Sequence, residues 1–271
     1  MNIATKVTPN IIATKDVSLE DKYVSDNGTA YMTGIQALVR LPLAQTRRDA
    51  MNGYHTAGFI SGYRGSPVGN YDSFLWQVQG LLKSHNVVFQ PGVNEDLAAT
   101  AIWGTQQVNL SGQGKYDGVS SWWYGKGPGV DRSGDVLRHA NLAGTSERGG
   151  VVALFGDDHS CKSSTIPHQS EHVMIGCGIP IFYPTSVQQI LDFGVHAIAV
   201  SRFSGLWSSM KLVSEIVETS ASVHVDLDRV TPVIPEDVNF PEGGVNIRWP
   251  DHGIQQEERL YKYRLPAVLA Y

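Results

Sequence analysis

The residues best suited to chemistry lie in the segment Asn94-Glu95-Asp96-Leu97-Ala98-Ala99-Thr100-Ala101. Its pattern predicts a helix that begins at Glu95 and whose small residues leave room for a flat group close to the backbone. A lone carboxyl group beside a pocket that water cannot fill is costly unless it is used. We therefore expect Glu95 to be shielded both from bulk solvent and from any lysine or arginine. The ordinary alternative is that acids such as Asp96 favour the first turn of a helix because of its dipole.

A second candidate segment is the loop Gly62-Tyr63-Arg64-Gly65-Ser66-Pro67-Val68-Gly69-Asn70, between an apparent strand and a helix. Backbone amides in such a loop can hold a phosphate or a ring. The loop matches neither the dinucleotide fingerprint nor the P-loop. A tight turn in which Ser66 or Asn70 caps the next helix explains it equally well. A later loop, Gly149–Ser160, ends in acids and a histidine, which we interpret as turn residues that cap backbone amides.

A competing pattern is His168-Gln169-Ser170-Glu171-His172, which matches the H-x-x-E-H motif of inverted zinc peptidases. On a helix, His168 and His172 would share one face, and Glu171 could act as general base. A third ligand would come from Glu242, Glu257 or Glu258. Because so short a pattern arises easily by chance in a chain with nine histidines, a zinc-dependent hydrolase is the alternative and not the leading hypothesis.

The elements that would position these residues alternate along the chain, which predicts an α/β fold with a mostly parallel sheet and helices on both faces. Ligands of such folds bind at the carboxyl ends of the strands, where the candidate loops lie. The pattern of Ser208–Glu218 predicts one further helix packed on the core. The expected strands are 56–61, 87–90, 118–124, 150–156 and 179–183, and the expected helices are 34–50, 70–83, 95–110, 133–143 and 186–200.

Composition limits the possible functions. The chain has 271 residues, 42% of them apolar, and a net charge of −5, so it is globular and has no obligatory nucleic-acid partner. No stretch approaches the ~20 apolar residues that span a bilayer, and two cysteines suit reduced thiols in a cytoplasm. We divide the chain into an N-terminal extension (1–30), a main domain (31–230) and a proline-rich linker that leads into a following segment (231–271). The apolar end Gln255–Tyr271 is either a docked terminal helix or, as we expect, the approach to further chain.

Four stretches taken in order resemble the 2-oxoacid:ferredoxin oxidoreductases, and within them the N-terminal part of the long indolepyruvate ferredoxin oxidoreductases. They are the Gly62–Gly69 loop, the Asn94-Glu95 helix start, Gly125-Lys126-Gly127-Pro128-Gly129-Val130-Asp131 and Gly149–Ser164. The likeness covers approximately Tyr31 to Leu227. It implies the thiamine diphosphate-binding fold, with this region as the pyrimidine-binding domain.

The resemblance assigns roles to individual residues. Glu95 matches the acid that hydrogen-bonds the pyrimidine nitrogen N1′, and is the implied catalytic residue. The other implied cofactor-binding residues are Tyr63, Gly65, Ser66, Pro67 and Asn94. Where the family usually has Tyr-Pro-Gly-Thr-Pro, this chain has Arg64 in place of a proline and Ser66 in place of a threonine. The hydroxyl group is therefore kept, and Arg64 receives no role.

The resemblance also implies oxidative decarboxylation of a 2-oxo acid, indolepyruvate or another arylpyruvate, with coenzyme A as acyl acceptor and electrons passing through [4Fe-4S] clusters to ferredoxin. The Gly-Asp-Gly motif that holds diphosphate and Mg²⁺ is absent, since Gly156-Asp157-Asp158 does not match it, and no cysteine-rich segment is present. We therefore expect no metal ligand here. The chain would be a fragment that works with further domains or a partner subunit in a homodimer, or else a stand-alone binding module. Trp122, Trp123 and Trp207 could stack on an aromatic substrate, although buried tryptophans more often belong to the core.

Overall fold

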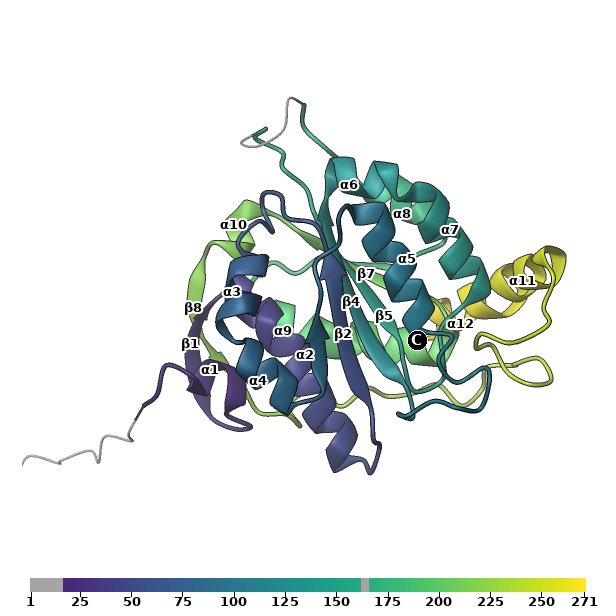
Figure 1. Ribbon diagram of the computed structural model, residues 1–271, viewed down its shortest axis with the longest axis horizontal. Helices are drawn as coiled ribbons and strands as arrows, with labels where there is room; N and C mark the ends of the chain where they lie inside the picture. The colour runs from purple at the N-terminus through teal and green to yellow at the C-terminus, as the bar shows by residue number, and fades with distance from the viewer. Residues whose placement is uncertain (1–16, 162–165) are drawn as a thin grey trace, which may run out of the picture.

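A six-stranded parallel sheet forms the centre of the computed structural model, which describes residues 17–161 and 166–271 (Figure 1). The strand order is β3-β2-β4-β5-β7-β6, and every neighbouring pair is parallel. This architecture confirms the predicted fold class. The strands are β2 (Ala57–Gly62), β3 (Val87–Phe89), β4 (Val119–Lys126), β5 (Val151–Gly156), β6 (Ile181–Phe182) and β7 (Ser208–Leu212).

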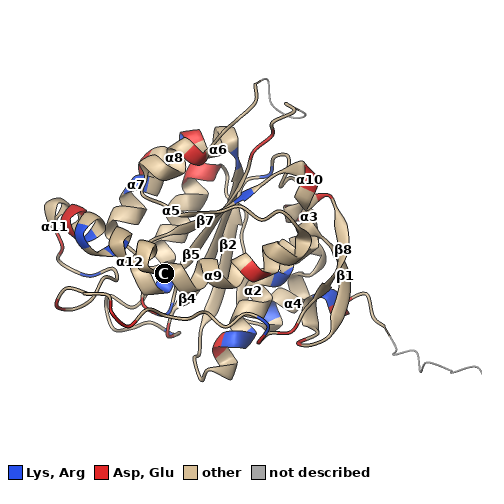
Figure 2. Cartoon of the chain, turned by 180° about the vertical axis from the view of Figure 1, so that it is seen from behind, with Lys and Arg blue, Asp and Glu red and all other residues tan. Residues whose placement is uncertain are grey.

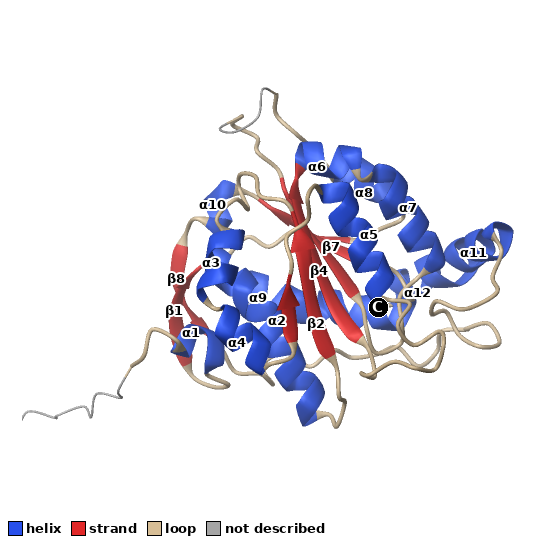
Figure 3. Cartoon of the chain, in the orientation of Figure 1, coloured by secondary structure: helices blue, strands red, loops and turns tan. Residues whose placement is uncertain are grey.

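Helices cover both faces of this sheet (Figure 3). One layer consists of α2 (Gly34–Met51), α3 (Tyr71–Gln77), α4 (Gln79–Ser84) and α9 (Val187–Ser204). The other consists of α5 (Glu95–Thr105), α6 (Gly127–Arg132), α7 (Gly134–Ala143) and α8 (Glu171–Gly176).

Side-chain alternation along β4 separates the core into two halves. Trp122 and Tyr124 point into the half beneath α2 and α9, whereas Trp123 points into the half beneath α5 and α7. All three side chains are buried, as successive strand residues are when both faces of a sheet are covered. Trp207 is likewise buried, on the Trp123 side, so these tryptophans are part of the core.

Local sequence fixes where the long helices begin. Thr33 and Gln36 form a capping box at the start of α2, each side chain bonding to the other's backbone amide at 3.2 and 3.0 Å. Asn94 caps α5 by accepting a hydrogen bond from Leu97 N at 2.8 Å. This cap makes Glu95 the first residue of α5.

A second, two-stranded sheet joins β1 (Thr29–Thr33) to β8 (Ser220–His224) in antiparallel register. The sequence did not indicate it, because the two strands are short and nearly 190 residues apart. The short helix α1 (Asp21–Val24) lies within the predicted N-terminal extension and packs on α2 through buried Tyr23. Residues 1–16 of that extension and 162–164 of the last matching stretch lie outside the described residues.

One predicted element is wrong. The expected helix Ser208–Glu218 is instead strand β7 followed by the short helix α10 (Ser214–Val217). β7 lies between β5 and β6, and pairing with both strands satisfies its backbone. All five of its residues are buried. The predicted helix 70–83 is split into α3 and α4, and the helix from Glu95 ends at Thr105 rather than Leu110.

The C-terminal region packs on the main domain through α11 (Gly253–Arg259), the π-helical turn η1 (Leu260–Arg264) and α12 (Leu265–Ala270). Arg264 is almost fully buried, and its guanidinium donates to the carbonyls of Asn141, Leu142, Ala143 and Val245 at 2.7–3.3 Å. It thereby satisfies carbonyls at the end of α7. Residues 231–251 contain no helix or strand, as predicted for a linker.

Candidate active site

The candidate residues meet where the chain changes direction across the sheet. After β2 the chain leads outward to β3 at one edge, and after β4 it leads to β5 on the opposite side of β2. The loops that follow β2 and β4 therefore diverge, and in open α/β sheets such divergence is expected to leave a crevice for a ligand at the carboxyl ends of the two strands. Ligands of open α/β sheets bind at such a switch point.

Glu95 lies on the α5 side of this crevice. The indole Nε1 of Trp123 donates to its backbone carbonyl at 2.9 Å, which ties the first turn of α5 to β4. The residue is only 8% exposed. The structure thus meets the expectation that this carboxyl group is sheltered from bulk solvent.

Two glycines of the Gly125–Asp131 stretch make room for the Glu95 side chain. A methyl group added at Gly129 would lie 2.5 Å from Cγ and 2.6 Å from Oε1 of Glu95. One added at Gly125 would lie 3.3 Å from the same Cγ and still closer to the Trp123 ring. The glycines of this stretch therefore allow β4 and α6 to approach the acid.

Arg132, the last residue of α6, lies within ion-pair distance of the acid. Its guanidinium lies 4.0 Å from Glu95 Oε2, at the outer limit of an ion pair, and its side chain is 52% exposed. The expectation that Glu95 is shielded from any lysine or arginine is therefore wrong. Because the pair is long and the arginine is half exposed, we expect the contact to be weak.

The loop after β2 lies beside the start of α5. Gly92 N donates to Gly62 O at 2.8 Å, and Tyr63 N donates to Tyr124 O at 3.0 Å. Tyr63 is 42% exposed. Gly65 abuts the side chain of Lys126, while Pro67 is packed against Gly156 at the end of β5.

The predicted caps of the following helix are only partly present. Asn70 occupies the N-cap position of α3 but makes no capping hydrogen bond with its side chain. The loop is held instead by its contacts with β4 and β5. The structure therefore brings Tyr63, Gly65, Ser66 and Pro67 to the same edge of the sheet as Glu95.

A second buried carboxyl group, Asp72, lies in the first turn of α3, close to the phenol of Tyr124. Burial raises the pKa of Asp72, against the opposing effects of the Tyr124 hydroxyl and the charge of Arg64. Sequence reasoning missed this pair, because the two residues are 52 positions apart.

The proposed zinc motif is not assembled. His168 precedes α8, which begins only at Glu171, so His168 and His172 do not share a helix face. Glu171 forms an ion pair with Lys211, which occupies the group expected to be the general base. Across residues 17–161 and 166–271, no group of three or more His, Cys, Asp or Glu side chains is placed to hold a metal ion.

Asp157 caps a backbone amide as predicted, but that amide lies 13 residues along the chain, at the start of α8, and not in a local turn. Asp157 accepts hydrogen bonds from the backbone amide and the hydroxyl of Ser170, at 2.9 and 2.6 Å. Lys211 in β7 lies 3.4 Å from the same carboxylate. Nothing in the sequence had pointed to Lys211.

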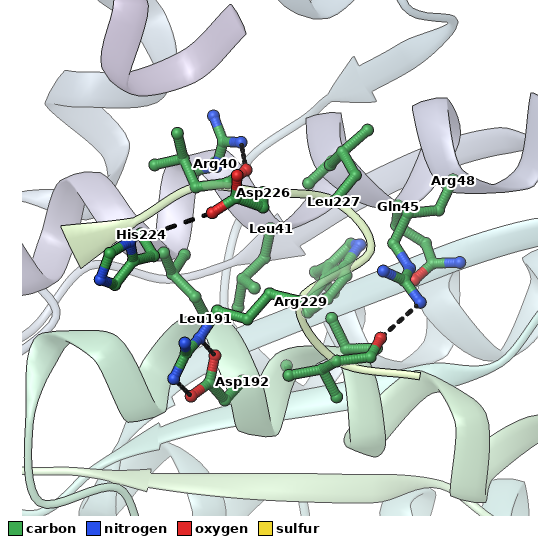
Figure 4. A pocket seen from close by; sticks show the side chains of 16 residues that line it. Arg40, Leu41, Gln45, Arg48, Leu191, Asp192, His224, Asp226, Leu227 and Arg229 are labelled. Carbon is green, nitrogen blue, oxygen red and sulfur yellow. Dashed lines mark hydrogen bonds and ion pairs between the residues drawn. The ribbon is translucent and has the colours of Figure 1, made fainter. Parts of the chain in front are cut away.

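A small, partly open cavity lies on the opposite side of the sheet from Glu95, between α2, α9 and residues 224–230 (Figure 4). Its volume of about 40 Å³ suits a water molecule rather than a substrate. At its rim Arg229 and Asp192 form an ion pair, with Nε and Oδ1 3.1 Å apart.

Comparison with known proteins identifies relatives of this chain. The chain is homologous to the indolepyruvate oxidoreductase subunit IorA of Methanothermobacter thermautotrophicus, with 26% identity over 168 residues, or 62% of this chain and 25% of the relative. The corresponding subunit of Methanothermobacter marburgensis is 23% identical over 65% of this chain and 26% of its own length. The chain thus spans about a quarter of the length of these curated relatives. No family model matches it.

The fold also resembles that of a solved enzyme. A 2-oxoglutarate:ferredoxin oxidoreductase from Magnetococcus marinus, with 2-oxoglutarate, coenzyme A and succinyl-CoA bound, superposes with a TM-score of 0.62 at 12% identity. The match covers 90% of this chain and 45% of that one.

No helix in the described part of this chain is long and apolar enough to cross a bilayer.

Proposed function

We propose that this chain supplies the pyrimidine-binding half of a thiamine diphosphate site in a 2-oxoacid:ferredoxin oxidoreductase, with Glu95 as the acid that meets the ring. The observation that carries the proposal is the sheltered Glu95 carboxyl group held against Gly129 at the switch point of the sheet. Homology to IorA and the likeness to a solved 2-oxoacid:ferredoxin oxidoreductase support it.

The residues present fit a bound aminopyrimidine. A sheltered carboxyl group can hydrogen-bond a ring nitrogen. Because Gly125 and Gly129 have no side chains, they do not crowd the Glu95 side chain. When bound, thiamine diphosphate supplies the nucleophilic carbon that attacks and decarboxylates the 2-oxo acid. Glu95 holds the proton at the ring nitrogen, while Tyr63, Gly65, Ser66, Pro67 and Asn94 line and orient the ring.

The wider activity is a proposal of the same kind. The names of the relatives favour indolepyruvate or another arylpyruvate as substrate, with coenzyme A and ferredoxin as partners. The diphosphate, Mg²⁺ and [4Fe-4S] clusters would be held outside this chain, by further domains or a partner subunit. A homodimer, a cytoplasmic location and the division at residues 30 and 230 remain predictions.

Replacement of Glu95 tests the proposal. In the complete enzyme, reduction of a viologen dye by indolepyruvate and coenzyme A should fall at least ~10²-fold in Glu95→Gln, as expected for loss of a proton-transfer group. Asp96→Asn is the matched control, because it removes the neighbouring acid of the same helical turn. Near-normal turnover in Glu95→Gln, with an unchanged melting temperature, would exclude Glu95 from the mechanism.

A further inference from the structure

A buried charge cluster lies on the Glu95 side of the sheet, apart from the crevice itself. It consists of Lys211 in β7, Asp157 after β5 and Glu171 at the start of α8. Lys211 pairs with Glu171 and lies 3.4 Å from Asp157 Oδ2. Lys211 is 4% exposed and Asp157 is 1% exposed. The ammonium also lies 5.2 Å from the centre of the Tyr183 ring.

Strand alternation puts Lys211 on this side. Its neighbours Met210 and Leu212 belong to the core beneath α2 and α9, so Lys211 faces the α5–α8 layer instead. Although burial lowers it, the Glu171 and Asp157 carboxylates raise the pKa of Lys211 overall, so the ammonium stays charged. Burying such charges costs free energy that apolar residues would avoid. The cluster therefore calls for an explanation other than stability.

The cluster anchors the segment that leads into α8. Ser170 is bound to Asp157 through both its amide and its hydroxyl, and Glu171 is bound to Lys211. Two residues earlier, His168 packs directly on Gly127 of α6, with its Nδ1 3.6 Å from Asp131 Oδ2. Figure 2 shows acidic positions where α6 and α8 lie side by side. The anchored segment, residues 168–171, therefore contacts α6 through His168 and Gly127.

The other side of α6 bounds the acid. Gly129 is in contact with the Glu95 side chain, and Arg132 lies 4.0 Å from its carboxylate. The contacts therefore run without a gap from Lys211, through residues 168–171, to α6 and Glu95. A shift of the anchored segment changes the space in which the acid sits.

We propose that Lys211 is a positioning residue for Glu95, acting through residues 168–171 and α6. The proposal rests on the function proposed above for Glu95. Without the ammonium, the Glu171 carboxylate loses its ion-pair partner and Asp157 keeps only its hydrogen bonds to Ser170, so we expect the segment to loosen and α6 to move. Because a displacement of about 1 Å at a reacting group can cost ~10²-fold in rate, we expect Lys211→Met to lose about 10- to 100-fold in kcat/KM.

The first test needs no cofactor. Hydrogen exchange on the full chain should show faster exchange of amides 127–132 and 168–176 in Lys211→Met, with α2 and α9 unchanged. Lys211→Arg should restore protection, since it keeps the charge. Lys262→Met is the control, because Lys262 pairs with Glu258 on the surface. Unchanged exchange in α6 would overturn the proposal.

The second test separates this proposal from the role of Glu95 itself. If Lys211 acts through Glu95, the double variant Glu95→Gln/Lys211→Met should have the same turnover as Glu95→Gln alone. If Lys211→Met lowers the turnover of Glu95→Gln by as much as it lowers that of the parent enzyme, the proposal is overturned. If Glu95→Gln is active, the proposed function fails, whatever the exchange data show. If Lys211→Met does not fold, Ser170→Ala replaces it, since it removes only the 2.6 Å hydroxyl bond to Asp157. Wild-type exchange and turnover in Ser170→Ala would then refute the anchoring.

Discussion

Replacement of Gly129 is the most specific perturbation of the candidate site, because it crowds Glu95 while leaving the acid itself in the sequence. In Gly129→Ala the new methyl carbon would lie 2.5 Å from Cγ, 2.6 Å from Oε1 and 2.7 Å from Cδ of Glu95, where ordinary contacts measure 3.4–4 Å. Glu95 must therefore move by about 1 Å, which can cost ~10²-fold in rate. The strain of overpacking, roughly 1–3 kcal/mol, is partly offset by the higher helix propensity of alanine, about 1 kcal/mol.

The assay compares turnover with stability. Viologen reduction by the complete enzyme should fall about 10²-fold in Gly129→Ala, while the melting temperature of the chain changes little. Gly134→Ala is the matched control, because Gly134 is a helical glycine with no atom within 4 Å of the added carbon. It should leave turnover unchanged and stabilise the chain by roughly 0.4–1 kcal/mol. Turnover within threefold of the parent enzyme in Gly129→Ala would refute the reasoning about Glu95.

Two further predictions concern stability. Burial raises the pKa of Asp72, so this carboxyl group stabilises the fold below its ordinary pKa of about 3.9, and that contribution is lost as pH rises through the raised value. Urea unfolding should show the parent losing stability relative to Asp72→Asn as pH rises from about 4; a difference independent of pH would contradict this. Arg202→Met leaves Asp49, 3% exposed, without its ion pair and should cost about 3–5 kcal/mol, whereas Arg229→Met, which breaks the exposed pair with Asp192, should not measurably shift the melting temperature. Equal shifts in these two variants would show that burial does not decide the strength of the pair.

The fold was predictable because its long elements carry strong local patterns. Residues 34–51 and 187–204 have helical periodicity with capping residues at their starts, and β4 and β5 are apolar segments bounded by glycine. The prediction of a helix over residues 208–218 was wrong because a buried strand followed by one helical turn places apolar residues at spacings that also suit a helix. Long-range pairing, such as β1 with β8, leaves no local trace.

The candidate site was predictable only in part, for a related reason. Glu95 stands out locally because a cap precedes it and small residues follow it. Arg132, Trp123 and Lys211 become relevant only when the sheet brings distant segments together. The one local trace of that packing was the alternation of glycines at 125, 127 and 129, whose close contacts with neighbouring side chains explain their spacing.

Arg264 bears on how the molecule can be shortened. Its guanidinium donates hydrogen bonds to the last carbonyls of α7, the helix that packs beside α5. A truncated version ending at residue 230 would strip those oxygens of their donors and uncover the apolar surface beneath Leu260 and Ala267. We therefore expect the smallest piece suitable for expression to extend through α12.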